Sequence, residues 1–170
     1  PDAGARTLDH CQECEPGWAC PSAGMTGMTT RCEAGYYCPS GSSSSTERPC
    51  PGGTYGATGN LTSAAECTVC PASVACPTGS GTTNGTWAPC APGHYCPVGT
   101  LAADSFDCPA GTYTNRTDLT DSSECTQCPE GFYCEGGRGY VSGACAAGHY
   151  CPLGTAFPHQ HPCPAGTHSS

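Results

Sequence analysis

The side chains with the most chemistry in this sequence are its eighteen cysteines. Thiols bind metals, exchange disulfides or pair structurally, and their spacing indicates which of these applies. The cysteines form three copies of a six-cysteine pattern, and the first copy steps by 3, 6, 12, 6 and 12 residues. Only the third step varies, to 14 and 11 in the later copies, and both gaps between copies are 17 residues. A phase kept this constant predicts a tandem array of disulfide-bonded repeats.

Metal and redox chemistry were the alternatives to disulfide bonding. Each CxxC pair (Cys11/Cys14, Cys67/Cys70, Cys125/Cys128) has the spacing of half a zinc site or of a redox pair. Both of those functions need free thiols, whereas an in-phase array uses its cysteines structurally. We therefore expect no metal site and no redox site.

The remaining polar residues indicate no catalytic site. The sequence has no paired carboxylates, nucleophile elbow, phosphate-binding loop or EF-hand pattern. His94 and His149 stand where CEAGYYC has Tyr36, so we interpret them as packing residues. His159, His161 and His168 are interpreted as a solvated loop. We expect no enzymatic activity and no cofactor.

The composition explains why the array needs covalent bonds. Leu, Val and Phe supply only 12 of 170 residues, Ile is absent, and Gly and Pro number 24 and 17. A chain this poor in large apolar groups cannot offset its ordering entropy by apolar burial, so disulfides must replace a core. The net charge of −9, with five Arg and no Lys, argues against a nucleic-acid or anionic-membrane partner.

Each repeat divides into two short modules. Loop modules begin with CPxGT sequences at 50–54, 108–112 and 163–167, and the first two reach a CxxC after 17 residues. Four-cysteine modules contain two C-x(5)-C turns with a central Gly, such as CEAGYYC at 32–38; CPASVAC at 70–76 has Ser73 instead. The glycine predicts a tight turn with positive φ, and the aromatic residue before the second Cys is suited to cover a disulfide.

These modules resemble the cysteine-rich repeats of tumour-necrosis-factor receptors and ephrin-receptor-like proteins, including mastigoneme-type fibre proteins. The resemblance rests on the CPAGTY-type loops and CxxGYYC-type turns and covers nearly the whole chain. It implies loop bonds Cys50–Cys67 and Cys108–Cys125. It also implies crossed bonds within the four-cysteine modules, namely Cys14–Cys32, Cys20–Cys38, Cys70–Cys90, Cys76–Cys96, Cys128–Cys145 and Cys134–Cys151. Spacing alone leaves open the rival in which each C-x(5)-C pairs internally, as in Cys14–Cys20.

Cys11 and Cys163 remain without partners in the crossed scheme. Residues 163–170 resemble the start of a loop module and residues 1–11 the end of one; joining them gives a spacing of 18 residues. We therefore expect these thiols to link segments head to tail, in a protomer array or in one window of a longer chain. A Cys11–Cys163 bond within one closed domain is the alternative. The expected repeats are 1–66, 67–124 and 125–170.

The disulfides predict a secreted protein, and three sequons agree with that location. N-glycosylation is expected at Asn60, Asn84 and Asn115. The candidates for O-glycosylation are Ser42, Ser43, Ser44, Ser45, Thr46, Thr82 and Thr83. The sequence shows no transmembrane run, so no membrane contact is expected in this segment, and the start at Pro1 indicates a mature fragment or window.

The expected fold is small and disulfide-rich: elongated tandem cysteine-rich repeats with short β-hairpins and almost no helix. We expect an extracellular, glycosylated structural protein that forms or coats a fibre, surface layer or appendage. The alternative is a ligand-binding ectodomain like those of the same receptors, in which Trp18, Trp87 and Phe157 would be hot-spot candidates.

Overall fold

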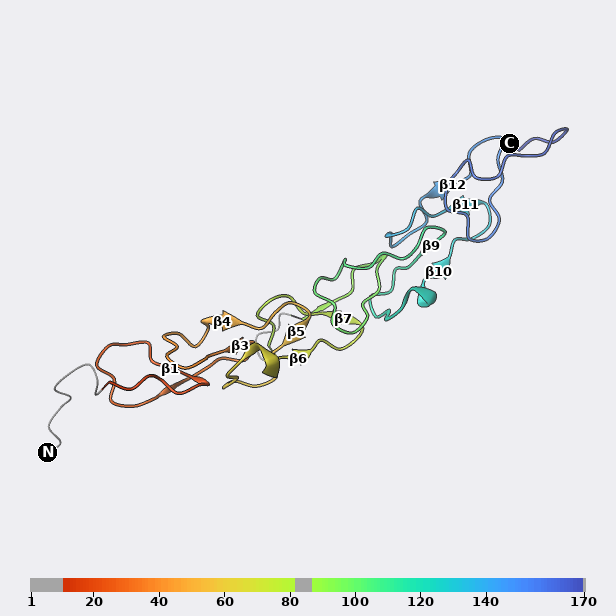
Figure 1. Ribbon diagram of the computed structural model, residues 1–170. Helices are drawn as coiled ribbons and strands as arrows, with labels where there is room; N and C mark the ends of the chain where they lie inside the picture. The colour runs from red at the N-terminus through yellow and green to blue at the C-terminus, as the bar shows by residue number, and fades with distance from the viewer. Residues whose placement is uncertain (1–10, 82–86, 170) are drawn as a thin grey trace, which may run out of the picture. The chain divides into compact units, whose positions relative to one another are not determined.

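The computed structural model describes residues 11–81 and 87–169 and confirms a small disulfide-rich fold built from hairpins. Six two-stranded antiparallel sheets pair β1 with β2, β3 with β4, β5 with β6, β7 with β8, β9 with β10 and β11 with β12 (Figure 1). Each strand has two residues. They are β1 Trp18–Ala19, β2 Thr30–Arg31, β3 Tyr36–Tyr37, β4 Arg48–Pro49, β5 Thr54–Tyr55, β6 Thr68–Val69, β7 Val74–Ala75, β8 Ala88–Pro89, β9 Thr112–Tyr113, β10 Thr126–Gln127, β11 Phe132–Tyr133 and β12 Gly143–Ala144.

One local rule builds these hairpins. A positive-φ residue follows a cysteine by three positions, the first strand comes next, and the second strand ends just before a later cysteine. That later cysteine donates its N–H to the carbonyl of the positive-φ glycine in four of these hairpins, as Cys32 does to Gly17 at 3.0 Å, and also in the turns at Gly93 and Gly148, which have only isolated β-bridges. The central glycines therefore have the predicted backbone conformation. Ser73 adopts it too, with φ of 69°, although serine gives no relief from the Cβ clash.

The disulfides correct half of the expected scheme. The loop bonds Cys50–Cys67 and Cys108–Cys125 are confirmed. The crossed bonds are wrong in this structure, because every C-x(5)-C turn closes on itself. The internal bonds are Cys14–Cys20, Cys32–Cys38, Cys70–Cys76, Cys90–Cys96, Cys128–Cys134 and Cys145–Cys151. They replace Cys14–Cys32, Cys20–Cys38, Cys70–Cys90, Cys76–Cys96, Cys128–Cys145 and Cys134–Cys151.

The hairpin register explains the internal pairing. The turn around each positive-φ residue folds the chain back, so that cysteine Cα atoms six residues apart lie 5.8–6.1 Å from each other, a normal disulfide span. Across the first module, Cys32 donates to the Gly17 carbonyl and the Gly17 N–H donates to the Cys38 carbonyl. The backbones of Cys32 and Cys38 are therefore both hydrogen-bonded to Gly17, in the middle of the first turn. Neither cysteine is placed opposite Cys14 or Cys20, as the crossed disulfides would require.

The three four-cysteine modules, residues 14–38, 70–96 and 128–151, share one internal backbone bond, in which the positive-φ residue of the first turn donates its N–H to the carbonyl of the last cysteine at 2.8–2.9 Å. The residue that closes the CPxG[ST] turn after each module, Ser42, Thr100 or Thr155, is 1% exposed. Its hydroxyl donates to the preceding proline carbonyl at 2.6–2.8 Å, and its own carbonyl accepts from Cys20, Cys76 or Cys134. Buried hydroxyls that are satisfied in this way stabilise a turn without apolar burial.

The buried residues are mostly cysteines, as the composition requires. The largest fully buried side chain among the described residues is Leu119, which packs with Cys108 and Cys125 and is covered by Tyr95. Leu61, the same position of the other loop module, is 9% exposed. Each of these leucines lies eleven residues after the cysteine that opens its loop, so the loop modules share one buried apolar position.

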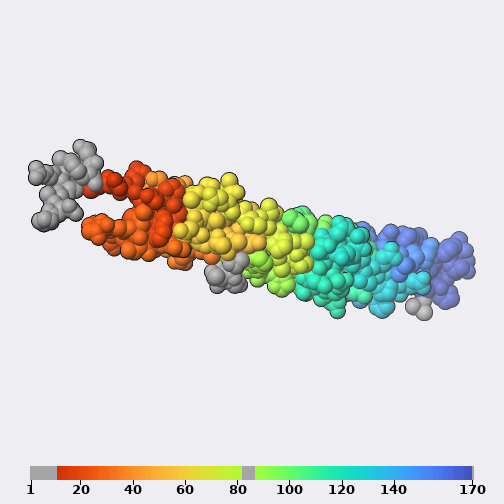
Figure 2. All heavy atoms as spheres, turned by 90° about the horizontal axis from the view of Figure 1, so that it is seen from below, coloured from red at the N-terminus to blue at the C-terminus, as the bar shows by residue number. Residues whose placement is uncertain are grey.

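The described chain divides into two compact units. One contains the residues up to Thr68 and Thr78–Gly81, and the other contains Val69–Pro77 and Trp87–Ser169. Within the second unit, residues near in sequence lie near in space, as the progression from green to blue shows (Figure 2). This is the organisation of a repeat array, in which stability comes from contacts between neighbouring modules.

Candidate functional site

Two thiols remain unbonded in the described residues, and they lie at complementary positions of the repeat. Cys163 is equivalent to Cys50 and Cys108, since all three donate their N–H to a turn glycine at 2.8–2.9 Å and all three open a CPxGT turn. In that turn Thr167 bonds to Pro164 as Thr112 does to Pro109. Cys163 is therefore built as the first cysteine of a loop disulfide.

Cys11 is equivalent to the second cysteine of the loop disulfide. It precedes Cys14 by three residues, as Cys67 precedes Cys70. Its side chain is exposed, and Cys163 is partly exposed. Each chain therefore has an unpaired first cysteine and an unpaired second cysteine of a loop disulfide, Cys163 and Cys11. The two loop modules inside the chain form the corresponding disulfide internally.

Two of the three sequons, those at Asn60 and Asn115, fall in loop modules but not at equivalent positions. Asn115 is exposed and follows the buried Thr114. Asn60 is half-buried, adopts a positive φ of 71° and donates its N–H to the Cys32 carbonyl. The hydroxyl of its sequon residue Thr62 donates to Glu66. A glycan at Asn60 would therefore have to be added before this loop folds, whereas Asn115 stays accessible.

The O-glycosylation candidates also differ in accessibility. The prediction of O-glycosylation at Ser42 is corrected, because the Ser42 hydroxyl is buried and donates a hydrogen bond to the Pro39 carbonyl. The folded chain therefore does not present this hydroxyl to solvent. Ser43 and Thr46 are exposed, whereas Ser44 and Ser45 are partly buried. Asn84, Thr82 and Thr83 lie outside the described residues.

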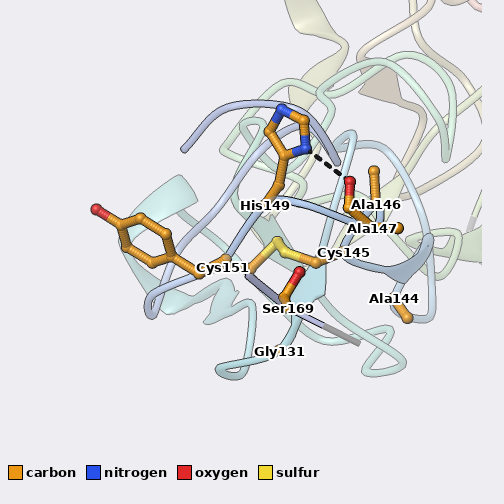
Figure 3. Close-up of a pocket in the computed structure, with 9 residues that line it drawn as sticks. Gly131, Ala144, Cys145, Ala146, Ala147, His149, Cys151 and Ser169 are labelled. Atoms are coloured by element: carbon orange, nitrogen blue, oxygen red, sulfur yellow. Dashed lines mark hydrogen bonds between the residues drawn. A yellow bond between two sulfur atoms is a disulfide. The ribbon is translucent and has the colours of Figure 1, made fainter. Parts of the chain in front are cut away.

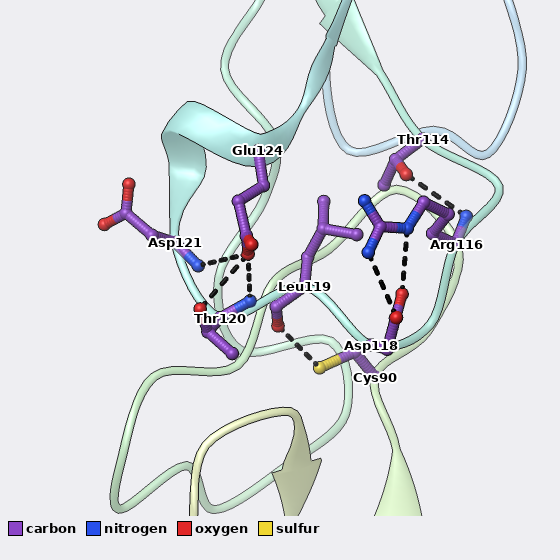
Figure 4. A network of polar contacts seen from close by, with 8 residues as sticks. All are labelled: Cys90, Thr114, Arg116, Asp118, Leu119, Thr120, Asp121 and Glu124. Atoms are coloured by element: carbon purple, nitrogen blue, oxygen red, sulfur yellow. Dashed lines mark hydrogen bonds and ion pairs between the residues drawn. The ribbon is translucent and has the colours of Figure 1, made fainter.

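A carboxylate cap organises the loop module that contains Asn115. Glu124 accepts from the N–H groups of Thr120 and Asp121 (Figure 4). Asp121 accepts from the Ser123 N–H, which completes a capping box on the 3-10 helix η3, Ser122–Glu124. These bonds lower the pKa of Glu124 below its usual value, chiefly through the Thr120 N–H. In the other loop Glu66, the last residue of η2 (Ala64–Glu66), accepts bonds from the N–H and the hydroxyl of Thr62, although the N-cap Ser63 makes no side-chain capping bond.

Acid is expected to loosen this cap. Because the pKa of folded Glu124 is lowered, its stabilisation is complete above the ordinary value of 4.5 and is lost as pH falls through the lowered value. An NMR titration of the Glu124 carboxyl should show a midpoint below 4.5. The protection factor of the Thr120 amide, which is its intrinsic exchange rate at each pH divided by the observed rate, should fall over the same range, and Glu124→Gln should abolish that fall. A midpoint at or above 4.5 would contradict the cap.

The histidines and large aromatic residues have separate surroundings. His94 Nε2 lies 2.9 Å from Asp107 Oδ1, and His149 packs edge-on against His159 with ring centroids 5.0 Å apart. The guanidinium of Arg31 lies over Trp18, in the first unit. Trp87 and Phe157 belong to the second unit, where Phe157 is exposed. Within residues 11–81 and 87–169, no three His, Cys, Asp or Glu side chains are arranged to hold a metal ion.

A pocket in the third four-cysteine module was not expected from the sequence. It lies over the Cys145–Cys151 disulfide and is lined by residues that include Gly131, His149, Tyr150 and Ser169 (Figure 3). Ser169 accepts a bond from the Gly148 N–H, and Gly148 in turn accepts from Cys163. The backbone of Cys163 is thus bonded to Gly148, whose neighbours Ala147 and His149 line the pocket. The only sequence signal for it is repeat position, since Tyr150 is equivalent to Tyr37 and Tyr95.

Comparison of the chain with protein-family models finds no match, and comparison with curated proteins finds none either. Among the described residues, no helix has the length and apolar character needed to cross a membrane.

Proposed function

We propose that this chain is an extracellular, glycosylated structural protein that forms or coats a fibre, surface layer or appendage by joining copies head to tail. The observation that carries the proposal is the equivalence of Cys163 to Cys50 and Cys108. The unpaired first cysteine of one copy is matched by the unpaired second cysteine, Cys11, of the next. A Cys163–Cys11 bond would extend the loop-disulfide pattern across the junction.

Bond formation follows ordinary thiol–disulfide exchange. Cys163 and Cys11 each lose a proton, and together they give two electrons to a disulfide oxidant such as oxidised glutathione, which leaves as two thiols. An oxidising extracellular compartment supplies such an oxidant. Glycans at Asn115, Asn60 and Asn84, and on exposed hydroxyls such as that of Ser43, would keep the array soluble.

Two matched single variants test the head-to-tail link. The chain is incubated with oxidised glutathione and sized without reductant, and we expect a ladder of linked copies. Cys11→Ser alone and Cys163→Ser alone should each stay monomeric, because each lacks one half of the bond. Mixed together, the two variants should give heterodimers and nothing larger.

The same experiment identifies the failures. Homodimers of Cys11→Ser would show that Cys163 pairs with itself, which contradicts head-to-tail joining. A wild-type chain that oxidises to a monomer without free thiols would indicate a closed domain and would favour a ligand-binding role.

A further inference from the structure

The disulfides of this chain are arranged in series along the sequence. All eighteen cysteines are among the described residues, and each of the eight bonds closes one turn or one loop into a disulfide ring. None of these bonds joins a ring to another ring. Six rings of six residue steps and two of 17 steps leave 82 of the 152 steps between Cys11 and Cys163 outside any ring.

Most of these free steps belong to six linking segments of 11 to 14 steps. They are 20–32, 38–50, 76–90, 96–108, 134–145 and 151–163. The linking segments bury little apolar surface, since they contain seven of the ten large apolar side chains that are exposed in the described residues: Met28, Val98, Leu101, Phe106, Tyr140, Leu153 and Phe157. Because apolar burial is the main force that holds packed segments together, the linking segments resist stretching weakly.

A few backbone hydrogen bonds join the two rings of each four-cysteine module. In all three modules the positive-φ residue of the first ring donates to the last cysteine of the second ring at 2.8–2.9 Å. The last cysteine of the first ring, Cys20, Cys76 or Cys134, donates to the turn after the second ring at 2.9–3.0 Å. These bonds are local to each module, so one module can open while the next stays folded.

We infer that the array is extensible and takes up mechanical load. Tension between Cys11 and Cys163 straightens the linking segments module by module, while the disulfide rings stay closed. Only hydrogen bonds and packing contacts break, so the covalent chain survives the load. This mechanical function goes beyond the proposed fibre, but it rests on the head-to-tail link, which would bring the load to these two residues.

The closed rings also favour recoil when the load falls. Each ring keeps the cysteines of its turn or loop together, with Cα atoms 5.8–6.1 Å apart. Refolding therefore has to close only the linking segments, and the entropic cost of closing a loop rises with its length. A loop of about ten residues closes within about 10 to 100 ns in a free chain. We expect the extended chain to shorten again without rearranging any disulfide.

Stretching single monomers tests this inference. DNA handles are attached to Cys11 and Cys163 by thioether bonds, and the chain is pulled in an optical trap without reductant. We expect a final contour length of about 330 Å between the two residues, reached in several steps. Each step should release less than about 90 Å, the length of two linking segments. The chain should return to its starting length when the force is removed, over repeated cycles.

Reduction of the tethered chain provides the matched comparison. The handles survive, the rings open, and the final contour length should rise to about 520 Å. Recoil should become at least about tenfold slower, because the loops that the disulfides had closed must then form again.

Two variants check the path of the load. Cys50→Ala with Cys67→Ala should lengthen the final contour by about 50 Å, and Cys14→Ala with Cys20→Ala by only about 15 Å. The final contour does not depend on whether a variant folds, so both results are interpretable.

The outcomes separate this inference from the proposed link. Extension in one step, or no recoil with the disulfides intact, would overturn the extensible array. A final contour near about 240 Å would do so too, because crossed disulfides would then lock the segments between turns. The handles replace the junction between copies, so none of these results affects the head-to-tail link. A missing ladder of linked copies would contradict that link while the stretching result on the monomer stands.

Discussion

Replacing Gly93 by alanine should destabilise the second unit by roughly 3 to 5 kcal/mol. Gly93 has φ of 94°, which costs an alanine about 1 to 2 kcal/mol. Its new Cβ would also lie 2.5–2.6 Å from backbone atoms of Gly137 and Arg138, which cannot rotate away as a side chain could. The neighbouring module would have to separate from the turn, and the bond from the Gly93 N–H to the Thr114 carbonyl would be strained.

Gly148→Ala is the matched control for that substitution. Gly148 has the same repeat position and a positive φ of 78°, but its added Cβ meets nothing within 4 Å. We expect it to cost only the conformational part, about 1 to 2 kcal/mol. Denaturant unfolding of the non-reduced monomers, followed by near-UV circular dichroism, measures both variants. Equal losses would show that neighbouring modules do not press on the Gly93 turn.

Removing the Cys108–Cys125 disulfide by Cys108→Ala and Cys125→Ala should cost more than removing any disulfide within a turn. The bond closes a 17-residue loop, which corresponds to about 3 kcal/mol in the loop-entropy model, against about 2 kcal/mol for a six-residue turn. Both sulfur atoms also pack against Leu119 in the only apolar cluster of the described residues. Their loss opens a cavity there and adds to the cost.

The double substitution at Cys145 and Cys151 provides the comparison in the same unit. That bond closes a six-residue turn whose Cys145 is only partly buried, so about 2 kcal/mol should be lost. The midpoints of denaturant unfolding should rank wild type above the Cys145/Cys151 variant, and that variant above the Cys108/Cys125 variant. The reverse order would mean that the loop modules contribute less than the turns.

Much of this fold is readable from the sequence because cysteine phase and glycine position are local signals. The glycine of each C-x(5)-C turn predicts the positive φ that makes a hairpin, whereas the 17-residue loop bonds were predicted from the resemblance of the modules to known cysteine-rich repeats. The crossed pairing was wrong because the spacing of cysteines along the sequence does not show which residues face each other across a hairpin. That register depends on bonds such as Cys32 to Gly17, which only the folded backbone displays.

The candidate site was predicted in part. The crossed scheme that the resemblance implied left Cys11 and Cys163 without partners, and both are also unpaired in the structure, where the turns close internally. The pocket beside Cys163 was missed, since Tyr150 is one aromatic residue among several in the sequence. The equivalent Tyr37 and Tyr95 contact Leu61 and the cluster around Leu119, which come more than twenty residues later in the sequence. Such contacts between distant residues are visible only in the folded chain.

The most direct test of the account is a tryptic disulfide map of linked copies, made from a mixture of ¹⁴N and ¹⁵N chains without reduction. Trypsin cuts after the exposed Arg31 and the partly exposed Arg138, each of which lies between the two turns of a four-cysteine module. We predict that peptide 7–31 is joined to peptide 139–170 through Cys11 and Cys163 alone, with both isotope combinations present. If peptide 7–31 stays disulfide-bonded to residues after Arg31, the internal pairing of the turns is contradicted. If the link between peptides 7–31 and 139–170 never joins a ¹⁴N peptide to a ¹⁵N peptide, head-to-tail joining of copies is contradicted.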